Sequence, residues 1–431
     1  MKKPKGTVSI IGGAGHVGLG LALVLTDASY RVFGVDLNKD ANAMIMSGKM
    51  PFIEHKGDEF LNRALANGLL EMTDSAEPLA GSETVVIVLG TPIDENLNPN
   101  LRPLFSVIEK SVIPNLHDQQ LILLRSTVSP GTTLRVKELI ESRTGKTCGK
   151  DFYLAYTPER VLQTKAIEEI QRLPQLIGAF DHASQAKAAA FFSSFIRGEC
   201  IFLTPVEAEL TKLITNMARY VEFALANEFY LVADSYGANI HRILEAANKD
   251  YPRMRVPRPG PNVGGPCLYK DGFFLVERIA FPELISTAFK INEGMTMHLV
   301  KHLRTLSPSV SKVGVLGLTF KADCDDTRNS LSFKLLKQLR AQGYEAVVVD
   351  PFVPGREDPS VLKNCDAVIL MTPHSAFSDL AGIHESVGNA NCWYSDLWGF
   401  WRDMRLSAES GWFQVSAEAK ALKATASQVS S

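Results

Sequence analysis

The sequence lacks an excess of charge of either sign. Its 45 Lys and Arg residues face 47 Asp and Glu residues, which gives a formal net charge of −2 over 431 residues. A near-neutral chain has no broad basic field, so we exclude nucleic-acid-binding proteins that act by neutralising many phosphates. No uninterrupted apolar run reaches the roughly 18–20 residues that a membrane-spanning helix needs, and the start passes into a glycine-rich turn rather than a cleavable signal. We therefore expect a cytoplasmic protein with neither a nucleic acid nor a membrane as partner.

Paired cysteines are also missing. The chain has six cysteines but no C-x-x-C pair, and no histidine stands at metal-ligand spacing from any of them. We therefore expect no disulfide and no metal.

At roughly 100–200 residues per domain, the length predicts two or three domains.

The first two hundred residues alternate between two patterns. Residues 7–36 read as a strand, a glycine turn, a helix and a second strand that ends in Asp36. Apolar runs at 85–92 and 121–130 then alternate with helical stretches, as a parallel sheet covered on both faces requires. This part of the chain is predicted to be doubly wound.

The pattern changes at Thr204. Thr204 and Glu207 fit a capping box, Pro205 fits the first helical position, and apolar positions continue to Gly237, which predicts one long helix that also offers a dimer surface. A second strand-turn-helix-strand begins near residue 310, and the polar end, 416–431, is expected to fray. The predicted fold class is α/β, with two Rossmann-like doubly wound domains joined by a long central helix and a helical dimerisation region. Its boundaries are 1–203, 204–300 and 301–431.

A glycine pattern follows the first predicted strand. Gly13, Gly15 and Gly18 form G-x-G-x-x-G, which lets the backbone turn tightly and lets a pyrophosphate approach the N-terminus of the next helix. Asp36 ends the second strand, where a carboxylate can bind a ribose 2′-hydroxyl and repel a 2′-phosphate. The pattern predicts NAD rather than NADP; the alternative is a glycine turn without a ligand.

Cys267 stands out among the cysteines. It follows Gly264 and Gly265, just before a predicted helix over 271–280 and near Lys270. A helix N-terminus and an ammonium both favour the thiolate, the form that a nucleophile needs. The alternative is a small apolar residue in a tight turn.

Polar residues on the long helix and at two strand ends are further candidates. Lys212, Asn216 and Arg219 share one face of the predicted helix, which lines a cleft or is a solvated stripe. Thr91 and Thr127 end apolar runs, where a parallel sheet holds ligands or where threonine serves only as a cap.

Together these segments resemble a known family. The sequence is similar to the nucleotide-sugar 6-dehydrogenases of the UDP-glucose/GDP-mannose dehydrogenase superfamily, and the likeness covers nearly the whole chain. Its motifs appear in the family's order: GGAGHVG, GTP at Thr91, STVSPGTT, TPERV, KLITNMARYVEFALANE, VGGPCLYKD and GLTFKADCDDTRNS. The resemblance implies an N-terminal NAD domain, a central helical region that forms a homodimer and a C-terminal domain that holds a UDP-sugar.

The resemblance also assigns residues. The implied catalytic residues are Cys267, Lys212, Asn216, Asp271, Glu159 and Thr127. The implied NAD contacts are Gly13, Gly15, His16, Val17, Gly18, Asp36, Thr91, Thr127 and Arg328. The implied substrate contacts are Arg160, Val161, Lys212, Asn216, Arg219, Tyr251, Arg253, Gly264, Phe320 and Lys321.

The resemblance implies a four-electron oxidation of the sugar C6 alcohol to a carboxylate by two NAD⁺ in succession. Cys267 would form a thiohemiacetal and then a thioester, because a second hydride can leave C6 only from a tetrahedral carbon. Lys212 and Asn216 would stabilise the oxyanion, Asp271 would orient a water and hold Lys212, and Glu159 would act as base in hydrolysis of the thioester, through a water ordered by Thr127.

The motifs leave the sugar open. They are closest to the UDP-N-acetylmannosamine and UDP-N-acetylhexosamine branch, although CLYKD keeps the lysine typical of the UDP-glucose branch, Gln163 replaces a glutamate, and VLQT departs from the branch pattern. UDP-glucose ranks second and GDP-mannose third. A two-electron hydroxyacid dehydrogenase and a non-catalytic NAD or sugar-nucleotide binding protein also stay open.

Overall fold

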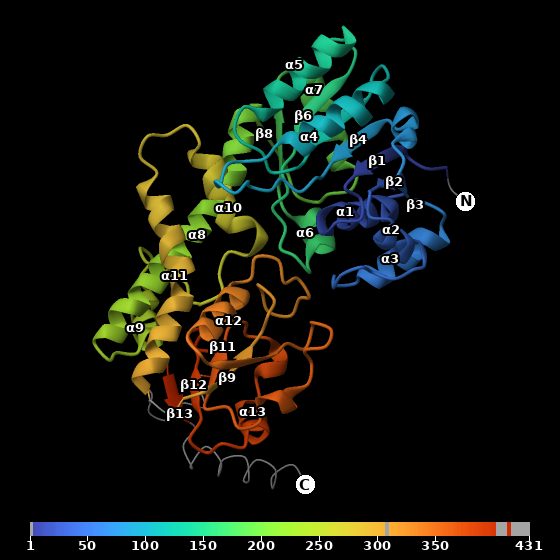
Figure 1. Ribbon diagram of the computed structural model, residues 1–431. Helices are drawn as coiled ribbons and strands as arrows, with labels where there is room; N and C mark the ends of the chain where they lie inside the picture. Colours follow the sequence, from blue (N-terminus) through green and yellow to red (C-terminus); the bar gives the residue numbers. More distant parts are fainter. Residues whose placement is uncertain (1–2, 307–309, 402–411, 415–431) are drawn as a thin grey trace. The chain divides into compact units, whose positions relative to one another are not determined.

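The computed structural model describes residues 3–306, 310–401 and 412–414 (Figure 1). The chain divides into two compact units. The first unit comprises the chain up to Thr215 together with Lys270–Ile279, and the second comprises Asn216–Tyr269 together with the chain from Ala280 onward. The predicted fraying of 416–431 lies outside the described residues.

An eight-stranded sheet is the centre of the first unit. Its strands are β1 (Thr7–Ile11), β2 (Arg31–Val35), β3 (Leu70–Thr73), β4 (Thr84–Ile87), β5 (Leu121–Leu124), β6 (Tyr153–Tyr156), β7 (Gln175–Ala179) and β8 (Cys200–Leu203). They lie in the order β3-β2-β1-β4-β5-β6-β7-β8, and every pair is parallel except β6 and β7. The strand order reverses at β1, so the carboxyl ends of β1 and β4 flank the point where such sheets bind ligands.

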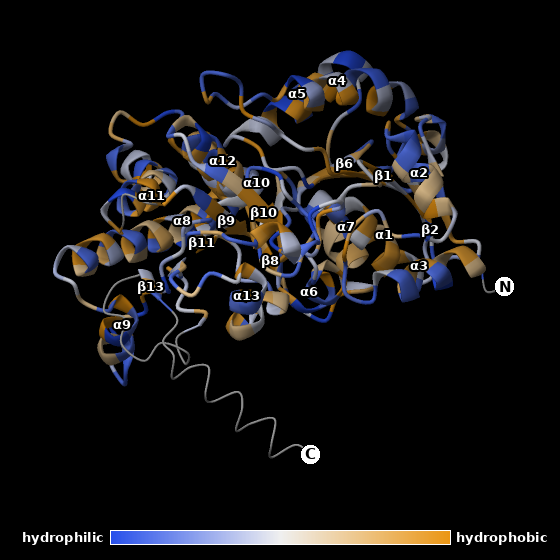
Figure 2. Cartoon of the chain, turned by 60° about the horizontal axis from the view of Figure 1, so that its bottom comes forward, coloured by the Kyte–Doolittle hydropathy of each residue, from blue (hydrophilic) through white to orange (hydrophobic). Residues whose placement is uncertain are grey.

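Helices cover both faces of this sheet. They are α1 (His16–Asp27), α2 (Lys39–Met46), α3 (Gly57–Ala66), α4 (Arg102–Val107), α5 (Thr132–Thr144), α6 (Ala166–Arg172) and α7 (His182–Ser193). Neighbouring residues of one strand face opposite cores: Val86 packs in the core that contains Leu19 of α1, whereas Val85 packs in the core that contains Val136 of α5. Figure 2 shows the matching apolar colouring of α1. The predicted doubly wound sheet is confirmed.

A five-stranded sheet forms in the second unit. Its strands are β9 (Lys312–Leu316), β10 (Glu345–Val349), β11 (Ala367–Leu370), β12 (Trp393–Ser395) and β13 (Trp412–Gln414), in the order β10-β9-β11-β12-β13. The helices that belong wholly to this unit are α9 (Ile240–Asn248), α11 (Glu283–Leu306), α12 (Leu331–Ala341) and α13 (Leu380–Val387). Val315 of β9 packs in the core with Leu299 and Leu335, whereas Leu316 packs in the core with Leu380. This sheet is also covered on both faces.

Two helices contribute to both units, namely α8 (Pro205–Ser235) and α10 (Gly265–Val276). The capping box that the sequence predicts at the start of α8 is present, because the Glu207 carboxylate accepts from the Thr204 amide at 2.8 Å and the Thr204 hydroxyl accepts from the Glu207 amide at 3.4 Å. The long central helix is therefore confirmed. The three domain boundaries stay a prediction.

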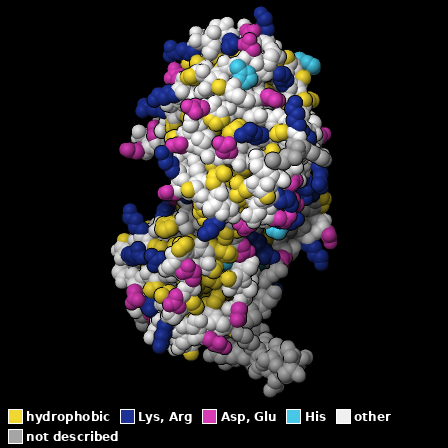
Figure 3. Space-filling view, turned by 90° about the vertical axis from the view of Figure 1, so that its right-hand side faces the viewer, with side chains coloured by type: hydrophobic (Ala, Val, Ile, Leu, Met, Phe, Trp, Pro, Cys, Tyr) yellow, Lys and Arg dark blue, Asp and Glu magenta, His cyan; other side chains and the backbone are white. Residues whose placement is uncertain are grey.

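The surface agrees with the balanced composition. On the face drawn in Figure 3, Lys and Arg side chains are interspersed with Asp and Glu. Among the described residues, no helix is both long enough and apolar enough to span a bilayer.

Candidate functional site

The glycine turn after β1 shows which glycines the fold itself needs. A Cβ on Gly18 would lie 2.1 Å from the Gly12 carbonyl oxygen, so only glycine lets α1 pack this closely on the turn. A Cβ on Gly15 would meet only the Gly12 oxygen, at 3.5 Å, and Gly15 is exposed. Packing within the chain therefore does not require glycine at position 15, whereas a pyrophosphate that approaches the α1 N-terminus does. This turn fits a dinucleotide.

Asp36 is fixed at the end of β2 beside that turn. Its carboxylate accepts hydrogen bonds from the Ala14 amide at 3.1 Å and from the Asn38 amide at 3.0 Å, and the side chain stays partly exposed. Each carboxylate oxygen has a second lone pair for a ribose hydroxyl. The predicted neighbours His16 and Val17 begin α1 half-buried, and the His16 ring stacks on Phe52 at 4.0 Å.

The loops after β4 and β5 are tied together. The Thr91 hydroxyl donates to the Thr127 carbonyl at 2.6 Å, and the Leu89 amide donates to the Ser126 hydroxyl at 2.7 Å. Thr91 and Thr127, predicted separately, thus meet at the carboxyl edge of the sheet.

Glu209 of α8 holds the loop that follows Thr127. Its buried carboxylate accepts from the Gly131 amide at 2.6 Å and from the Thr133 amide at 2.8 Å. Burial raises the pKa of Glu209 despite these donors. Glu209 was not predicted from the sequence, because only its partners, 76–78 residues earlier in the chain, reveal its role.

Glu159 is embedded in hydrogen bonds. It pairs with the buried Arg125, and its other oxygen accepts from the amides of Arg160 at 2.7 Å and Val161 at 3.0 Å. Arg125 in turn donates to the Thr157 carbonyl at 2.9 Å. Glu159 therefore fixes the TPERV loop as well as being a candidate base.

The polar residues of α8 differ in exposure. Lys212 is half-buried, Asn216 is 7% exposed and Arg219 is exposed. Lys212 belongs to the first unit, while Asn216 and Arg219 belong to the second. The predicted common face thus combines a buried amide with a solvated guanidinium.

Cys267 lies inside the first turn of α10, not ahead of the helix. The prediction of a helix over 271–280 was wrong at both ends, because α10 runs from Gly265 to Val276. Gly264 and Gly265, at φ +121° and +54°, end the loop and let the helix begin early. A Cβ on Gly265 would lie 2.3 Å from the Phe320 ring, so this turn packs directly on Phe320. The thiol is exposed and near a helix N-terminus, as a nucleophile requires.

Arg328 forms an ion pair with a buried carboxylate. Its guanidinium binds Asp326, with Nε donating at 2.9 Å and Nη2 donating at 2.6 Å. The pKa of Arg328 is raised, first by this hydrogen bond.

Asn262 anchors the loop before Cys267. Its buried side chain accepts from the Leu331 amide at 2.8 Å and donates to the Thr319 carbonyl at 2.9 Å and the Thr372 hydroxyl at 3.0 Å. It joins this loop to the segment that carries the predicted residues Phe320 and half-buried Lys321. Asn262 was not predicted from the sequence either; its only local signal is its place in PGPNVGGPC.

Asp271 is fully buried and pairs with Lys270 at 3.1 Å. Burial, with the charges of Glu209 and Asp271, raises the pKa of Tyr156 well above its ordinary value. Lys270, which was expected to favour the thiolate, thus binds the carboxylate that was expected to hold Lys212.

Tyr251 and Arg253 lie together in the second unit. The Arg253 guanidinium stacks over the Tyr251 ring at 4.5 Å, and its Nε donates to the Tyr251 hydroxyl at 3.1 Å. Tyr251 lines a groove of about 680 Å³ beside Glu222 and Asn248. Two predicted substrate contacts therefore form one planar, cationic surface.

Three family models match successive parts of the chain. The UDP-glucose/GDP-mannose dehydrogenase family's NAD binding domain matches residues 6–196, its central domain 206–294 and its UDP binding domain 314–403.

Individual relatives agree with these models. The chain is 34% identical to UDP-N-acetyl-D-mannosamine dehydrogenase of Pyrococcus horikoshii, over 88% of this chain and 91% of the relative. It is 29% identical to NDP-N-acetyl-D-galactosaminuronic acid dehydrogenase of Ralstonia nicotianae, over 87% and 92%. The solved structure of the P. horikoshii UDP-D-ManNAc dehydrogenase matches with a TM-score of 0.83 at 33% identity, over 88% of this chain and 93% of that chain. The chain therefore belongs to the UDP-glucose/GDP-mannose dehydrogenase family and is an NAD-dependent nucleotide-sugar dehydrogenase.

Proposed function

We propose that this enzyme oxidises the C6 alcohol of a UDP-N-acetylhexosamine to the carboxylate, with UDP-N-acetyl-D-mannosamine as the leading candidate. The relatives from P. horikoshii and R. nicotianae support the N-acetylhexosamine. The observation that carries the proposal is the exposed Cys267 in the first turn of α10, near a helix N-terminus.

NAD⁺ supplies the hydride acceptor when bound. Gly13, Gly15 and Gly18 would hold its pyrophosphate, and Asp36 would bind a ribose hydroxyl. His16, Val17, Thr91, Thr127 and Arg328 complete the proposed contacts.

Cys267 makes the second oxidation possible. Loss of a proton and a hydride converts the C6 alcohol to an aldehyde, and the thiolate then adds to its carbonyl carbon. The resulting thiohemiacetal loses the second hydride and a proton and becomes a thioester. Water cleaves the carbon–sulfur bond, which releases the carboxylate and restores the thiol.

Neighbouring side chains assist these steps. Lys212 and Asn216 stabilise the C6 oxyanion, because an ammonium and an amide both donate hydrogen bonds to developing negative charge. Asp271 and Glu159 orient or deprotonate water, with Thr127 ordering it for Glu159. The two amides and the arginine that bind Glu159 hold this carboxylate in place.

Substrate recognition draws on charged and aromatic side chains. Lys321 neutralises the diphosphate, and the Tyr251–Arg253 pair offers a flat cationic face. The remaining proposed contacts are Arg160, Val161, Lys212, Asn216, Arg219, Gly264 and Phe320.

We further propose a cytoplasmic homodimer that serves polysaccharide biosynthesis. Exposed apolar side chains at the end of α8, on α9 and between the two helices support dimerisation, since Val232, Tyr236 and Ile243 are 52%, 83% and 45% exposed. These residues line an apolar groove of about 440 Å³.

A donor panel tests the substrate. UDP-N-acetylmannosamine, UDP-N-acetylgalactosamine, UDP-glucose and GDP-mannose are each assayed with NAD⁺, and kcat/KM is compared by NADH absorbance. We expect an N-acetylhexosamine to exceed UDP-glucose by at least about tenfold. A preference for UDP-glucose would show that the proposed sugar is wrong. UDP-glucose is the next candidate because a solved UDP-glucose dehydrogenase from Pyrobaculum islandicum matches this chain with a TM-score of 0.80 at 27% identity, over 88% of this chain and 92% of that chain.

Cys267→Ser tests the chemistry. We expect acid formation to fall by at least about a thousandfold, because the serine hydroxyl stays protonated and is a poor nucleophile. Cys200→Ser, at a half-buried cysteine of β8, is the matched control and should retain activity. Full activity of Cys267→Ser would remove the covalent step.

A further inference from the structure

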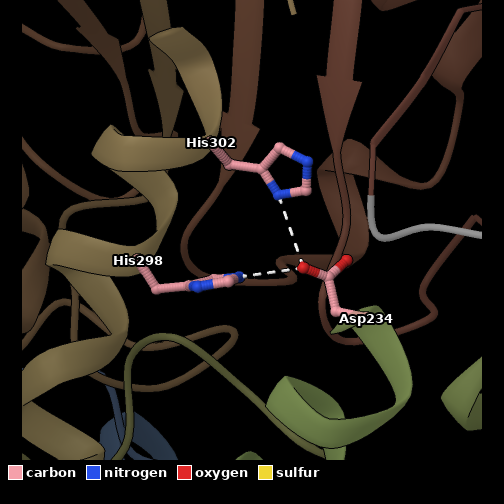
Figure 4. Close-up of side chains that lie close together, drawn as sticks. All are labelled: Asp234, His298 and His302. Carbon is pink, nitrogen blue, oxygen red and sulfur yellow. Dashed lines mark ion pairs between the residues drawn. The ribbon is translucent and has the colours of Figure 1, made fainter. Parts of the chain in front are cut away.

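A carboxylate and two imidazoles lie close together in the second unit. None of the three belongs to a proposed catalytic or binding residue. Asp234 comes from the C-terminal end of α8, and His298 and His302 lie one turn apart on α11. Figure 4 shows the three side chains pointing toward one another. One ligand atom from each lies within 4.8 Å of the others.

The separation of the carboxylate oxygen from each imidazole nitrogen fits ligands around one ion. The Asp234 Oδ2 atom is 3.4 Å from His298 Nε2 and 3.6 Å from His302 Nδ1. A protonated imidazole donating to a carboxylate would approach to about 2.7–2.9 Å. Two ligands held at about 2.0–2.1 Å on a tetrahedral Zn²⁺ stand roughly 3.3 Å apart. The separations therefore suit a metal ion better than a proton.

One buried atom of the cluster, Asp234 Oδ1, has no hydrogen-bond partner among the described residues, and the contact of the buried His298 Nε2 atom is the 3.4 Å ion pair with Asp234 Oδ2. A buried polar atom left unpaired costs roughly 1–3 kcal/mol, so groups of this kind normally have a partner. An ion between the three side chains would satisfy the imidazole nitrogen directly and the carboxylate by one or both oxygens.

The cluster is accessible to solvent. Its three side chains are 12–25% exposed, which allows an ion to enter.

We propose that Asp234, His298 and His302 bind one divalent transition-metal ion of the Zn²⁺ class, with water as a fourth ligand. Two imidazoles and one carboxylate favour such an ion over Mg²⁺ or Ca²⁺, which prefer oxygen ligands. Asp234 is 64 residues before His298, so the complete set cannot be read from local sequence.

The ion would act on the structure rather than on the chemistry. It joins the end of α8 to α11 beside the core that contains Tyr230 and Trp412, whose rings lie 5.5 Å from His298 and 6.1 Å from His302. None of the three ligands belongs to the proposed catalytic or binding residues. The inference therefore stands independently of the proposed function.

Zn²⁺ titration of the chelator-treated full-length protein tests the proposal. The measurements use the Cys267→Ser background, because an exposed thiolate also binds zinc. We expect one Zn²⁺ bound per chain in calorimetry and a higher Tm with Zn²⁺ than without it. His298→Ala and His302→Ala should each weaken binding by at least about a hundredfold, whereas His182→Ala, a histidine on the surface of α7, should not.

A conservative variant guards against misfolding. Asp234→Asn keeps the side-chain shape and should retain the metal-free circular dichroism spectrum while losing at least about tenfold in Zn²⁺ affinity. Co²⁺ substitution should give a visible spectrum of nitrogen and oxygen ligands without a thiolate charge-transfer band. No saturable Zn²⁺ binding, unchanged affinity in the histidine variants, or a thiolate band would each overturn the proposal.

Discussion

The two units end their second strand with the same residue type but use it differently. Asp36 follows β2 and Asp350 follows β10. Asp36 remains partly exposed, with two amides at its oxygens. Asp350 is fully buried, binds His374 at 3.1 Å and accepts from the amides of Leu318 and Thr319 at 2.6 and 3.1 Å. The Asp36 carboxylate is therefore accessible to a ligand, whereas the buried Asp350 carboxylate is occupied by hydrogen bonds within the chain.

The loops beside these carboxylates explain the difference. Four residues, 12–15, separate β1 from α1, and they bring the α1 N-terminus close to Asp36. Residues 317–330 separate β9 from α12, and two amides of this longer loop, those of Leu318 and Thr319, donate to Asp350. The same strand-loop-helix-strand order therefore has two uses. In the first unit it leaves a turn that fits a dinucleotide, and in the second unit it anchors the loop that carries Phe320, Lys321 and Arg328.

The largest expected effect separates two nearby glycines, Gly15 in the loop after β1 and Gly18 in the first turn of α1. Gly18→Ala should lower the free energy of unfolding by about 2–4 kcal/mol, because its Cβ would overlap the Gly12 carbonyl. Gly15→Ala should leave stability within about 1 kcal/mol yet weaken NAD binding, because the methyl enters the ligand's path. Urea unfolding and NAD titration of both variants measure this; equal destabilisation would show that Gly15 is also required for packing.

Substitution of each of the two carboxylates should give the next largest effect, a change in KM for NAD⁺. Asp36→Ala should raise KM for NAD⁺ by roughly tenfold to a hundredfold and leave KM for the sugar nucleotide nearly unchanged, since charged hydrogen bonds contribute about 1.5–3 kcal/mol. Asp350→Asn is the matched control and should not raise KM for NAD⁺. Steady-state kinetics with each substrate varied decides the point, and the reverse ranking would refute the ribose role of Asp36.

Stability should show the opposite order. Asp350→Asn should lower the free energy of unfolding by about 1–3 kcal/mol, because either orientation of the amide turns its NH₂ group toward a backbone N–H that donates to the carboxylate, that of Leu318 or that of Phe352. Asp36→Asn should cost less than about 1 kcal/mol. Denaturant unfolding compares the two, and equal losses would mean that Asp350 is no more structural than Asp36.

Lowering the pH should have the smallest effect, a change in the stability difference between the wild type and Asp350→Asn. Burial acts to raise the pKa of Asp350, yet His374 and the loop amides hold it below its ordinary value. A carboxyl with a lowered folded pKa contributes stability at pH above its unfolded value, and this contribution is lost as pH falls through the folded value. The stability difference between the wild type and Asp350→Asn should therefore narrow below about pH 4, the unfolded pKa of an aspartate. A difference that grows on acidification would reverse the assigned sign.

Local patterns were enough to predict much of this molecule. The Gly13–Gly18 turn, Asp36, the Thr204 cap and Cys267 are signals within a few residues, so the sequence shows them directly. Glu209 and Asn262 were missed because their partners lie far along the chain. The start of α10 was misplaced because Gly264 and Gly265 read as loop, although positive φ there lets the helix begin at Gly265.

Chain topology hides the Asp234–His298–His302 cluster in the same way. Neither α8 nor α11 alone carries these three ligands, and only their packing brings the carboxylate to the imidazoles. Side chains that act through partners far along the chain can therefore be identified only from the structure. Turns and helix caps can be identified from the local sequence more often.

The number of NADH molecules formed per sugar nucleotide tests the central claim most directly. With limiting UDP-N-acetylmannosamine and excess NAD⁺, we predict two NADH per sugar and the uronic acid as sole product, because Cys267 returns the aldehyde carbon to a tetrahedral state. One NADH per sugar, with free aldehyde accumulating and no dependence on Cys267, would contradict it.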